Sequence, residues 1–496
     1  MSAPANPAFL VQHSFASLPD CCYEFCQPTP VSAPQWLAFN QDLAEQLGLP
    51  ADYHGTELGL QLFAGNQLPD WTQPLAQAYA GHQFANFVPR LGDGRAILLA
   101  EVQDQQQQVR DIQLKGSGPT PFSRGGDGRA ALGPVMREYL LSEAMHALGV
   151  PSTRALAAVL TGDWVYRDSA QPGAILTRVG SSHLRIGSFQ YIALQQATDP
   201  KQAGILQRYA DYAIKRHYPH CQQQAAPYLA LLAAVIDKQA QLVAHWMSLG
   251  FIHGVMNTDN CSISGETIDY GPCAFMEAYD PNTVFSAIDR RGRYAYGNQP
   301  AMALWNLTRL AEALLPLIDD EQSRAIALAS EALQQFQSAY ERQWLNRMAA
   351  KLGITQANAE DKPLIDGWLA LLQQHQADFT RSFYLLSQPD TDALAESFQH
   401  SSAWQSWLLL WQQRLAQQGL GQAQLITQIH SVNPCVIPRN HLVQQAIDMA
   451  MEHGDLSLFQ QLHRVWQQPF VDTGENRAFQ QPATAAQAVT RTFCGT

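Results

Sequence analysis

Cysteine is scarce in this chain of 496 residues, and its spacing argues against two kinds of structural site. The eight cysteines stand at positions 21, 22, 26, 221, 261, 273, 435 and 494, and no two of them form a C-x-x-C pair. A disulfide-stapled scaffold or a structural zinc site needs a denser and more regular pattern. Cys21, Cys22 and Cys26 form the one cluster, and we interpret it as incidental because no second cluster stands at ligand spacing.

The chain also lacks an excess of basic residues. Its formal net charge is −12 and its isoelectric point is about 5.6. A protein that binds nucleic acid without sequence preference needs a basic surface. We therefore expect no nucleic-acid partner.

Long apolar runs are missing as well. The longest candidate, residues 228–236, is far shorter than the roughly 20 residues of a membrane-spanning helix. The first residues, Met-Ser-Ala-Pro-Ala-Asn-Pro, have neither the basic segment and apolar core of a signal peptide nor the arginines of a transit peptide. We therefore expect a cytoplasmic protein without a membrane partner.

What the chain has in quantity is apolar sequence. Hydrophobic residues make up 46% of it and charged residues 15%, so it can bury large cores. Its length suffices for roughly three domains at about 150 residues each. Periodicity and turn residues predict the following elements: a helix over 35–47, strands over 96–102 and 111–114, helices over 134–147, 202–218 and 224–249, and almost only helix from 302 onward, including one over 391–418.

The strongest motif lies between His253 and Gly271. It contains His-Gly-Val-Met-Asn-Thr-Asp-Asn and ends in Asp269-Tyr270-Gly271. His253 and Asn260 have the H-R-D-x-x-x-x-N spacing of a protein-kinase catalytic loop, and Asp269 follows like the aspartate of Asp-Phe-Gly. The segment between them predicts a hairpin with a Ser-Gly turn. An amide oxygen and a carboxylate on adjacent segments are suitable ligands for Mg²⁺ bound with ATP.

One position departs from the kinase pattern. Val255 stands where a kinase has its catalytic aspartate, and a carboxylate reappears at Asp259. Asp and Asn also favour turns for backbone reasons, which would explain Asp259 and Asn260 alone. With Asp269 nine residues further on, a nucleotide site is the better interpretation.

Glycine-rich segments come earlier in the chain. Leu-Gly-Asp-Gly-Arg ends at Arg95, and a longer loop from Gly116 to Arg129 is rich in Gly, Arg and Asp. Glycines in such turns let the backbone approach a phosphate, although a lone Gly-x-Gly is most often only a tight turn. Lys115 ends a predicted strand and is a candidate phosphate ligand, and Glu138 or Glu143 on the following helix could reach it.

Two arginines stand at unusual places. Arg178 lies inside a strand-like run and Arg185 follows Ser-Ser-His-Leu. The guanidinium is permanently charged and binds phosphate through two donors. Either arginine could instead pair with a structural carboxylate, and the residues alone favour that interpretation.

Together these motifs resemble the selenoprotein O family. The similar segments are Gly-His-Gln-Phe, Leu-Gly-Asp-Gly-Arg, Leu-Lys-Gly-Ser-Gly-Pro-Thr, Ser-Arg-Gly-Gly-Asp-Gly-Arg, Met-Arg-Glu-Tyr, His-Gly-Val-Met-Asn-Thr-Asp-Asn and Asp-Tyr-Gly-Pro. The resemblance implies an α+β, protein-kinase-like two-lobe fold with an N-terminal extension and a large helical C-terminal region. We expect the extension over 1–80, the N-lobe over 81–160, the C-lobe over 161–301 and the helical region with its tail over 302–496.

The resemblance also implies an activity. Such proteins transfer AMP from ATP, with the nucleotide flipped relative to a kinase, to Ser, Thr or Tyr hydroxyls of protein substrates. It implies that Asp259 is the general base, that Asn260 and Asp269 hold Mg²⁺ or Mn²⁺, and that Glu138 supports Lys115. The implied ATP-binding residues are Gly92, Gly94, Arg95, Lys115, Asp127, Gly128, Arg178, Arg185 and Asp269.

Many eukaryotic members of that family carry selenocysteine third from the C-terminus, where this chain has Cys494. Cys273 follows Asp-Tyr-Gly-Pro. We hypothesise that these two cysteines form a regulatory disulfide; two free thiols are an equally good interpretation.

Two other functions stay open. One is a kinase of proteins or small hydroxyl compounds, and the other is an inactive ATP-binding regulator, suggested by Val255. Neither the substrates nor the oligomeric state follow from the sequence.

Overall fold

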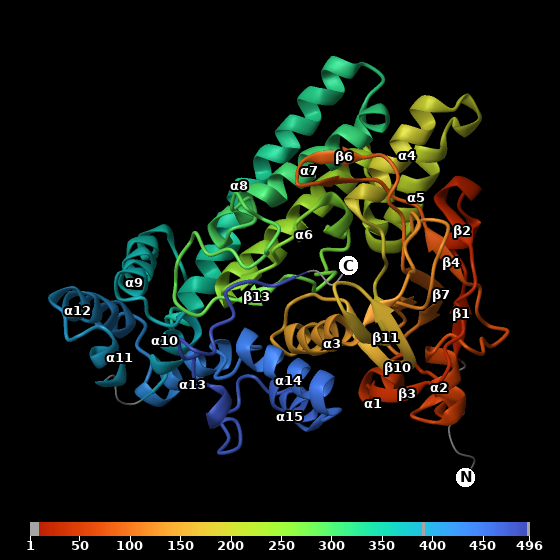
Figure 1. The fold of residues 1–496 in the computed structure, drawn as a ribbon. Coiled ribbons are helices and arrows are strands. Elements are labelled where there is room, and N and C mark those ends of the chain that lie inside the picture. The colour runs from red at the N-terminus through yellow and green to blue at the C-terminus, as the bar shows by residue number, and fades with distance from the viewer. Residues whose placement is uncertain (1–8, 389–391, 494–496) are drawn as a thin grey trace, which may run out of the picture.

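An antiparallel sheet from the first 180 residues forms one side of the molecule (Figure 1). The computed structural model describes residues 9–388 and 392–493. The strand order is β2-β4-β7-β8-β11-β10-β3, with β1 paired to β7 and β9 to β11. These strands are β1 (Leu10–Gln12), β2 (Tyr23–Phe25), β3 (Gln35–Phe39), β4 (Leu75–Gln77), β7 (Ala96–Gln103), β8 (Val109–Lys115), β9 (Ala130–Ala131), β10 (Arg154–Tyr166) and β11 (Ala170–Gly180).

The side chains of β8 alternate between a face that packs on α1 and α2 and the opposite face, called the functional face below, which carries Lys115. Ile112 and Leu114 belong to a core with α1 (Gln41–Gln46) and α2 (Glu57–Phe63). Gln113 and Lys115 point to the opposite face because successive strand residues alternate. Lys115 pairs with Ala96 of β7 and Leu176 of β11, so it stands in the middle of the sheet. On that face α3 (Leu132–Ala147) crosses β10 and β11.

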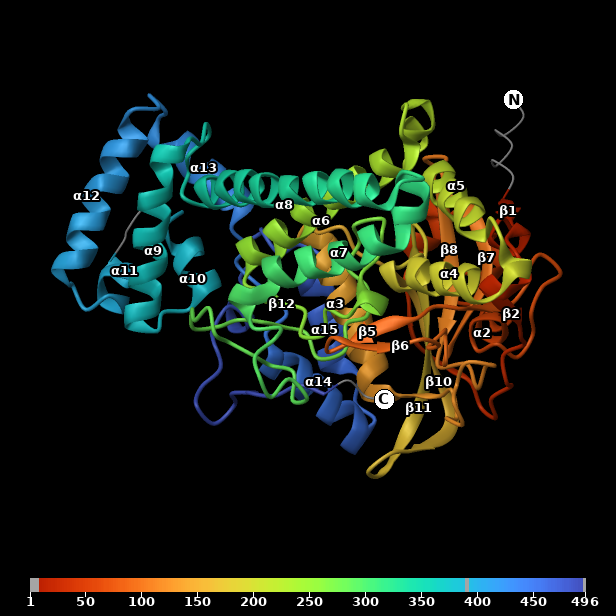
Figure 2. The same cartoon turned by 90° about the horizontal axis from the view of Figure 1, so that it is seen from above.

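A helical part follows the sheet and makes up the rest of the molecule (Figure 2). Its core is a layer of three long helices, α6 to α8, that pack on one another. The helices are α4 (Ile186–Thr198), α5 (Ile205–His217), α6 (Pro227–Leu249), α7 (Gln299–Ile318), α8 (Gln322–Lys351), α9 (Lys362–His375), α10 (Phe379–Leu385), α11 (Asp392–Ser397), α12 (Ser402–Ala416), α13 (Gln422–Val432), α14 (Asn440–His453) and α15 (Ser457–Trp466).

One helical stretch, Tyr296–Ile318, is long and apolar enough to cross a membrane by length and composition. It contains α7, which packs against α4, α6 and α8. Residues along it, including Leu307, Leu310 and Leu314, are buried in the main core. Packing inside the protein therefore accounts for part of its apolar character, since 44% of the apolar window is buried.

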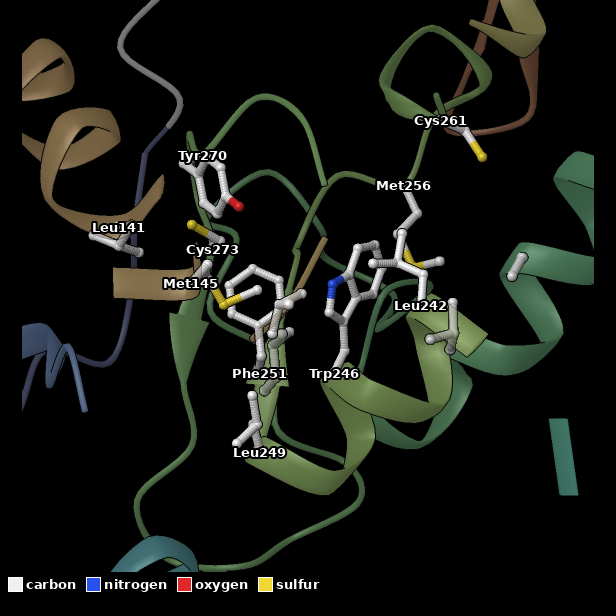
Figure 3. Packing of buried hydrophobic residues seen from close by; sticks show 14 of the residues in the cluster. Leu141, Met145, Leu242, Trp246, Leu249, Phe251, Met256, Cys261, Tyr270 and Cys273 are labelled. Carbon is white, nitrogen blue, oxygen red and sulfur yellow. The ribbon is translucent and has the colours of Figure 1, made fainter. Parts of the chain in front are cut away.

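Two short strands close the loop that carries the strongest motif. The helix α6 ends at Gly250, whose φ of 72° lets the chain turn into β12 (Phe251–Ile252). The strand β12 pairs with β13 (Ala274–Phe275), so residues 253–273 form a loop with both ends fixed. Beneath it the Phe251 ring lies 5.6 Å from Trp246 and 6.3 Å from Tyr270, centroid to centroid (Figure 3). This apolar layer holds the loop against the rest of the protein.

Three sequence-based predictions of elements need correction. Residues 35–47 are not one helix: Gln35–Phe39 pair with β10, and α1 begins after Asn40, whose side chain caps it. The segment 261–268 keeps its turn, but its two arms pair outward, Ser262 with Arg185 and Thr267 with Ser152, and not with each other. The helix expected over 391–418 is divided into α11 and α12, with Ser401 capping the second; residue 391 lies outside the described residues.

Candidate active site

A cavity of about 630 Å³ lies between the functional face of the sheet and the 253–273 loop. It is lined by side chains from both sides and by the glycine-rich loop between β8 and α3. The sequence-predicted residues on its wall are Gly92, Gly94, Arg95, Lys115, Asp127, Gly128, Arg178, Arg185, Asp259, Asn260 and Asp269. Glu138 stands behind Lys115. The fold thus brings together residues up to 177 positions apart around one space.

Lys115, Arg178 and Asp269 line the centre of the cavity, and Glu138 pairs with both cations from behind. The Nζ of Lys115 lies 2.6 Å from an oxygen of Glu138 and 2.6 Å from one of Asp269. Arg178 donates to Glu138 from Nε at 2.8 Å and from Nη2, and its Nη2 lies 3.6 Å from Asp269. Of the two glutamates considered for Lys115, Glu143 pairs with Arg154 instead.

These charges keep both carboxylates ionised. Burial alone would raise the pKa of Glu138, but Arg178 and Lys115 outweigh it and hold the pKa below its ordinary value. The pKa of Asp269 is also held well below its ordinary value, because Lys115, Arg178 and Arg95 together outweigh its burial. Asp269 also has a φ of 68°, a left-handed conformation that aspartate tolerates better than most residues. A phosphate entering here would find two cations already held in place.

Arg185 is placed at the junction between the sheet and the loop. Its guanidinium lies 4.3 Å from the centroid of the Tyr79 ring, and its Nη1 is 3.3 Å from Asp93. The backbone of Arg185 forms an isolated β-bridge with that of Ser262. The N–H of the next residue, Ile186, donates to the Cys261 carbonyl at 2.9 Å. Arg185 is therefore buried but still lines the cavity.

The glycine-rich loop forms the outer wall. Gly92 and Gly128 have positive φ angles of 71° and 64°, and a Cβ at either would lie about 2 Å from other atoms, at 2.2 Å from the Phe122 ring and 2.0 Å from the Gly118 oxygen respectively. Both positions therefore require glycine. Asp127 is the most exposed of the predicted residues on this wall, and Arg167 of the segment after β10 pairs with it at 2.8 and 2.9 Å.

The 253–273 loop supplies the remaining predicted residues. The Nε2–H of His253 donates to the Ile268 carbonyl at 2.9 Å, which connects the start of the motif to the residue before Asp269. The Nδ2 of Asn260 donates to the Val255 carbonyl at 3.2 Å, so its oxygen is the atom that Asn260 can offer to a cation. Within residues 9–388 and 392–493 no group of three or more His, Cys, Asp or Glu side chains could hold a metal ion. The oxygens of Asn260 and Asp269 fit Mg²⁺ or Mn²⁺ only if the nucleotide supplies further ligands.

Asp259 is almost completely enclosed, with 9% of its surface exposed, although it lines the cavity. Burial raises its pKa to about 6, against the opposing charge of Arg185 and the hydrogen bond from Gln83. A carboxylate with a pKa near the operating pH is suited to general-base chemistry. Val255, at the kinase position, contributes only an apolar wall.

Several residues on the wall were not predicted from the sequence. Tyr79 and Arg167 belong to no sequence motif. Their place in the site follows only from the contacts of Tyr79 with Arg185 and of Arg167 with Asp127. Gln83 belongs to the Gly-His-Gln-Phe motif, which had no chemical role, and lies 3.5 Å from Asp259. The one sequence feature that could have pointed to Gln83 is the position of this motif shortly before the glycine-rich segments.

Cys273 is buried and lies next to the chain's C-terminal segment. The Thr492 hydroxyl donates to the Pro272 carbonyl, and the Thr492 backbone pairs with Phe285 and Ala287. Burial raises the pKa of Cys273 to about 12. Cys494 lies outside the described residues, so the disulfide stays a hypothesis.

Comparisons with known proteins identify the family of this chain. A family model described as protein adenylyltransferase SelO matches residues 8–467. A protein of Bradyrhizobium diazoefficiens named protein nucleotidyltransferase YdiU is 50% identical over 492 residues, which cover 98% of this chain and 99% of the relative. A protein of the same name from Rhizobium rhizogenes is 51% identical over 501 residues, covering 100% of this chain and 98% of the relative. The chain therefore belongs to the SelO family of protein adenylyltransferases.

Proposed function

We propose that this enzyme transfers AMP from ATP to Ser, Thr or Tyr hydroxyls of protein substrates in the cytoplasm and releases pyrophosphate. The observation that carries the proposal is the placement of Asp259. It shares one cavity with Lys115, Arg178 and Arg185, while the kinase position is taken by Val255. A base away from the kinase position is expected if the acceptor attacks the α-phosphorus and not the γ-phosphorus.

The reaction follows from these residues. The acceptor hydroxyl gives its proton to the Asp259 carboxylate, and its oxygen forms a bond to the α-phosphorus. The bond between that phosphorus and the bridging oxygen to the β-phosphate breaks, and pyrophosphate leaves with the bonding electrons. Arg178 and Arg185 would stabilise the charge that develops on pyrophosphate, and Lys115 would grip a phosphate oxygen while Glu138 holds it in place.

A divalent cation completes the proposed site. Asn260 and Asp269 would hold Mg²⁺ or Mn²⁺, which neutralises phosphate charge when bound. The glycines 92, 94 and 128, with Arg95 and Asp127, would surround the rest of the nucleotide. In this proposal the sheet and α3 correspond to a kinase-like N-lobe and the layer around α6 to a C-lobe, and the N-lobe would then extend to the end of β11 at Gly180 and not end at residue 160.

Substitution of the candidate base tests the proposal. Asp259→Asn keeps the size of the side chain but removes the proton acceptor, so we expect AMP transfer to fall by about 100-fold or more with ATP binding retained. AMP transfer is measured with ATP labelled at the α-phosphate. Asp448→Asn, on the exposed face of α14, is the matched control and should transfer at the parent rate. A parent-like rate in Asp259→Asn would refute the role of Asp259.

A further inference from the structure

A small hairpin reaches from the sheet side to the candidate base. It consists of β5 (Gly81–Gln83) and β6 (Asn86–Val88), and Figure 2 shows it beside α7, away from the main sheet. The strand β5 packs against α4 and against the turn that holds Asp259. Because alternate residues of a strand share a face, Gly81 and Gln83 lie on one face of β5 and His82 on the other.

The face with Gly81 and Gln83 closes over the Asp259 carboxylate. A Cβ at position 81 would lie 2.5 Å from Oδ1 of Asp259 and 2.8 Å from Cδ1 of Leu91, so this oxygen keeps its present place because Gly81 has no side chain. That oxygen is buried and has no hydrogen-bond partner. The amide nitrogen of Gln83 lies 3.5 Å from the other oxygen, Oδ2. One residue therefore limits the position of Oδ1, and the other is placed to orient Oδ2.

The opposite face and the backbone fix the hairpin. The His82 ring lies 2.8 Å from the Gln190 amide and packs on Trp305 at 5.2 Å between ring centroids. The backbone N–H of His82 donates to the Thr258 hydroxyl at 2.7 Å, and that of Phe84 donates to Asn257 at 3.0 Å. The residues just before Asp259 are thus bound to the hairpin at two points.

We propose that the β5–β6 hairpin is the positioning element of the transfer site, with Gln83 as a positioning residue for the Asp259 carboxylate and Gly81 as the residue that makes room for it. The inference rests on the proposed function, since it concerns the base named there. Neither residue needs to touch ATP or the acceptor to act in this way. Their substitution should therefore lower the rate without changing the binding of ATP.

Two substitutions test this inference on the full-length protein. Gln83→Met keeps the length of the side chain and removes its donor, and we expect the initial rate at saturating ATP to fall by about 10-fold. Gly81→Ala pushes on Oδ1, and we expect a fall by about 100-fold, as for small misplacements of a reacting group. The rate is AMP transfer from α-labelled ATP to the proteins of a soluble cell extract, and the apparent KM for ATP should stay unchanged.

Matched controls separate positioning from a general loss of structure. Gln106→Met changes an exposed glutamine at the tip between β7 and β8, and Gly474→Ala changes a glycine with nothing within 4 Å of the added Cβ. Both should keep the parent rate. The thermal unfolding midpoint is recorded for every variant. If Gly81→Ala proves unfolded, the inference is tested by the rate of Gln83→Met alone.

Four other results would overturn the inference. Parent-like rates in Gln83→Met and in folded Gly81→Ala would overturn the inference while leaving the proposed function intact. A loss that a large excess of extract restores would also overturn it, because the hairpin would then bind the acceptor. A raised KM for ATP in these variants would show that the hairpin takes part in ATP binding and does not position the base. If Asp259→Asn, measured in parallel, keeps the parent rate, the proposed base fails and the inference fails with it.

Discussion

Lys351, at the end of α8, is a buried cation outside the candidate site. The residue is 3% exposed, and its Nζ lies 4.4 Å from the centroid of the Phe383 ring and 5.7 Å from that of Phe379. Burial lowers its pKa to about 7. An unfolded lysine has a pKa of about 10.4, so above neutral pH the unfolded chain binds more protons at this position than the folded one.

This difference predicts a rise of stability with pH. The cost of burying the charge is fully present below the folded pKa and is relieved as pH rises toward the unfolded pKa. Lys351→Met has no such cost at any pH. We expect its free energy of unfolding, relative to the parent, to decrease by about 1.4 kcal/mol per pH unit between about pH 7.5 and 9.5. Urea unfolding at several pH values measures this, and a constant difference between the two proteins would contradict it.

At the residue scale, the sequence predicts the chemical role of a side chain better than it predicts which other side chain it contacts. It narrowed the partner of Lys115 to Glu138 or Glu143, which both lie on the predicted helix. Helical spacing could not decide between them, because the choice depends on Arg154, which takes Glu143, and Arg178, which joins Glu138. Gln83 had no predicted role because its contact, Asp259, is 176 residues away.

At the scale of elements, periodicity predicted the strands β7 and β8 and the helices α3 and α6 closely. These elements have clear apolar patterns, and a glycine follows β8, α3 and α6 within two residues. The prediction failed where long-range pairing decides the structure. Residues 35–39 join β10, and the arms around Gly265 pair with Arg185 and Ser152. Neither pairing leaves a local signal, because the partner strand lies far away in the sequence.

The glycine-rich loop between β8 and α3 allows a prediction at this scale. Gly125 and Gly128 both have positive φ, so alanine strains the backbone at either. Only at Gly128 does the added Cβ meet backbone, at 2.0 Å from the Gly118 oxygen; at Gly125 it meets nothing within 4 Å. We expect Gly128→Ala to weaken ATP binding by about tenfold or more, and Gly125→Ala, the matched control, by much less. Titration calorimetry with ATP measures both, and equal losses would contradict a steric requirement at Gly128.

At the scale of the whole molecule, a buried arginine joins the C-terminal helices to the segment after β13. Arg439, which is 1% exposed, pairs with Asp378 at 2.8 Å and with Glu277 at 3.3 Å, and it donates to the Gln480 carbonyl at 2.9 Å. Glu277 also accepts from the Ala483 backbone. The region from 302 onward, whose role the sequence did not indicate, is therefore attached at Glu277 to the segment that follows the 253–273 loop with the candidate metal ligand Asp269.

Removal of this arginine should destabilise the entire protein. Arg439→Met leaves two carboxylates without their cation, and breaking a buried pair from one side costs about 3–5 kcal/mol. Arg464→Met is the matched control, because Arg464 and Glu475 form an exposed pair worth about 0–1 kcal/mol. Denaturant unfolding compares the two variants with the parent. Equal stabilities for the two variants would show that the Arg439 network does not hold the C-terminal region in place.

The central claim, transfer of AMP to protein hydroxyls, is tested most directly by the position of the label. The protein is incubated with a cell extract, Mg²⁺ or Mn²⁺, and ATP labelled at either the α- or the γ-phosphate, under reducing conditions. We predict that protein retains label from the α-labelled ATP and none from the γ-labelled ATP. Label from the γ-phosphate alone would make the enzyme a kinase and contradict the roles given to Arg178 and Arg185. If neither phosphate is transferred, both enzyme functions are contradicted, and an inactive ATP-binding regulator is the remaining interpretation.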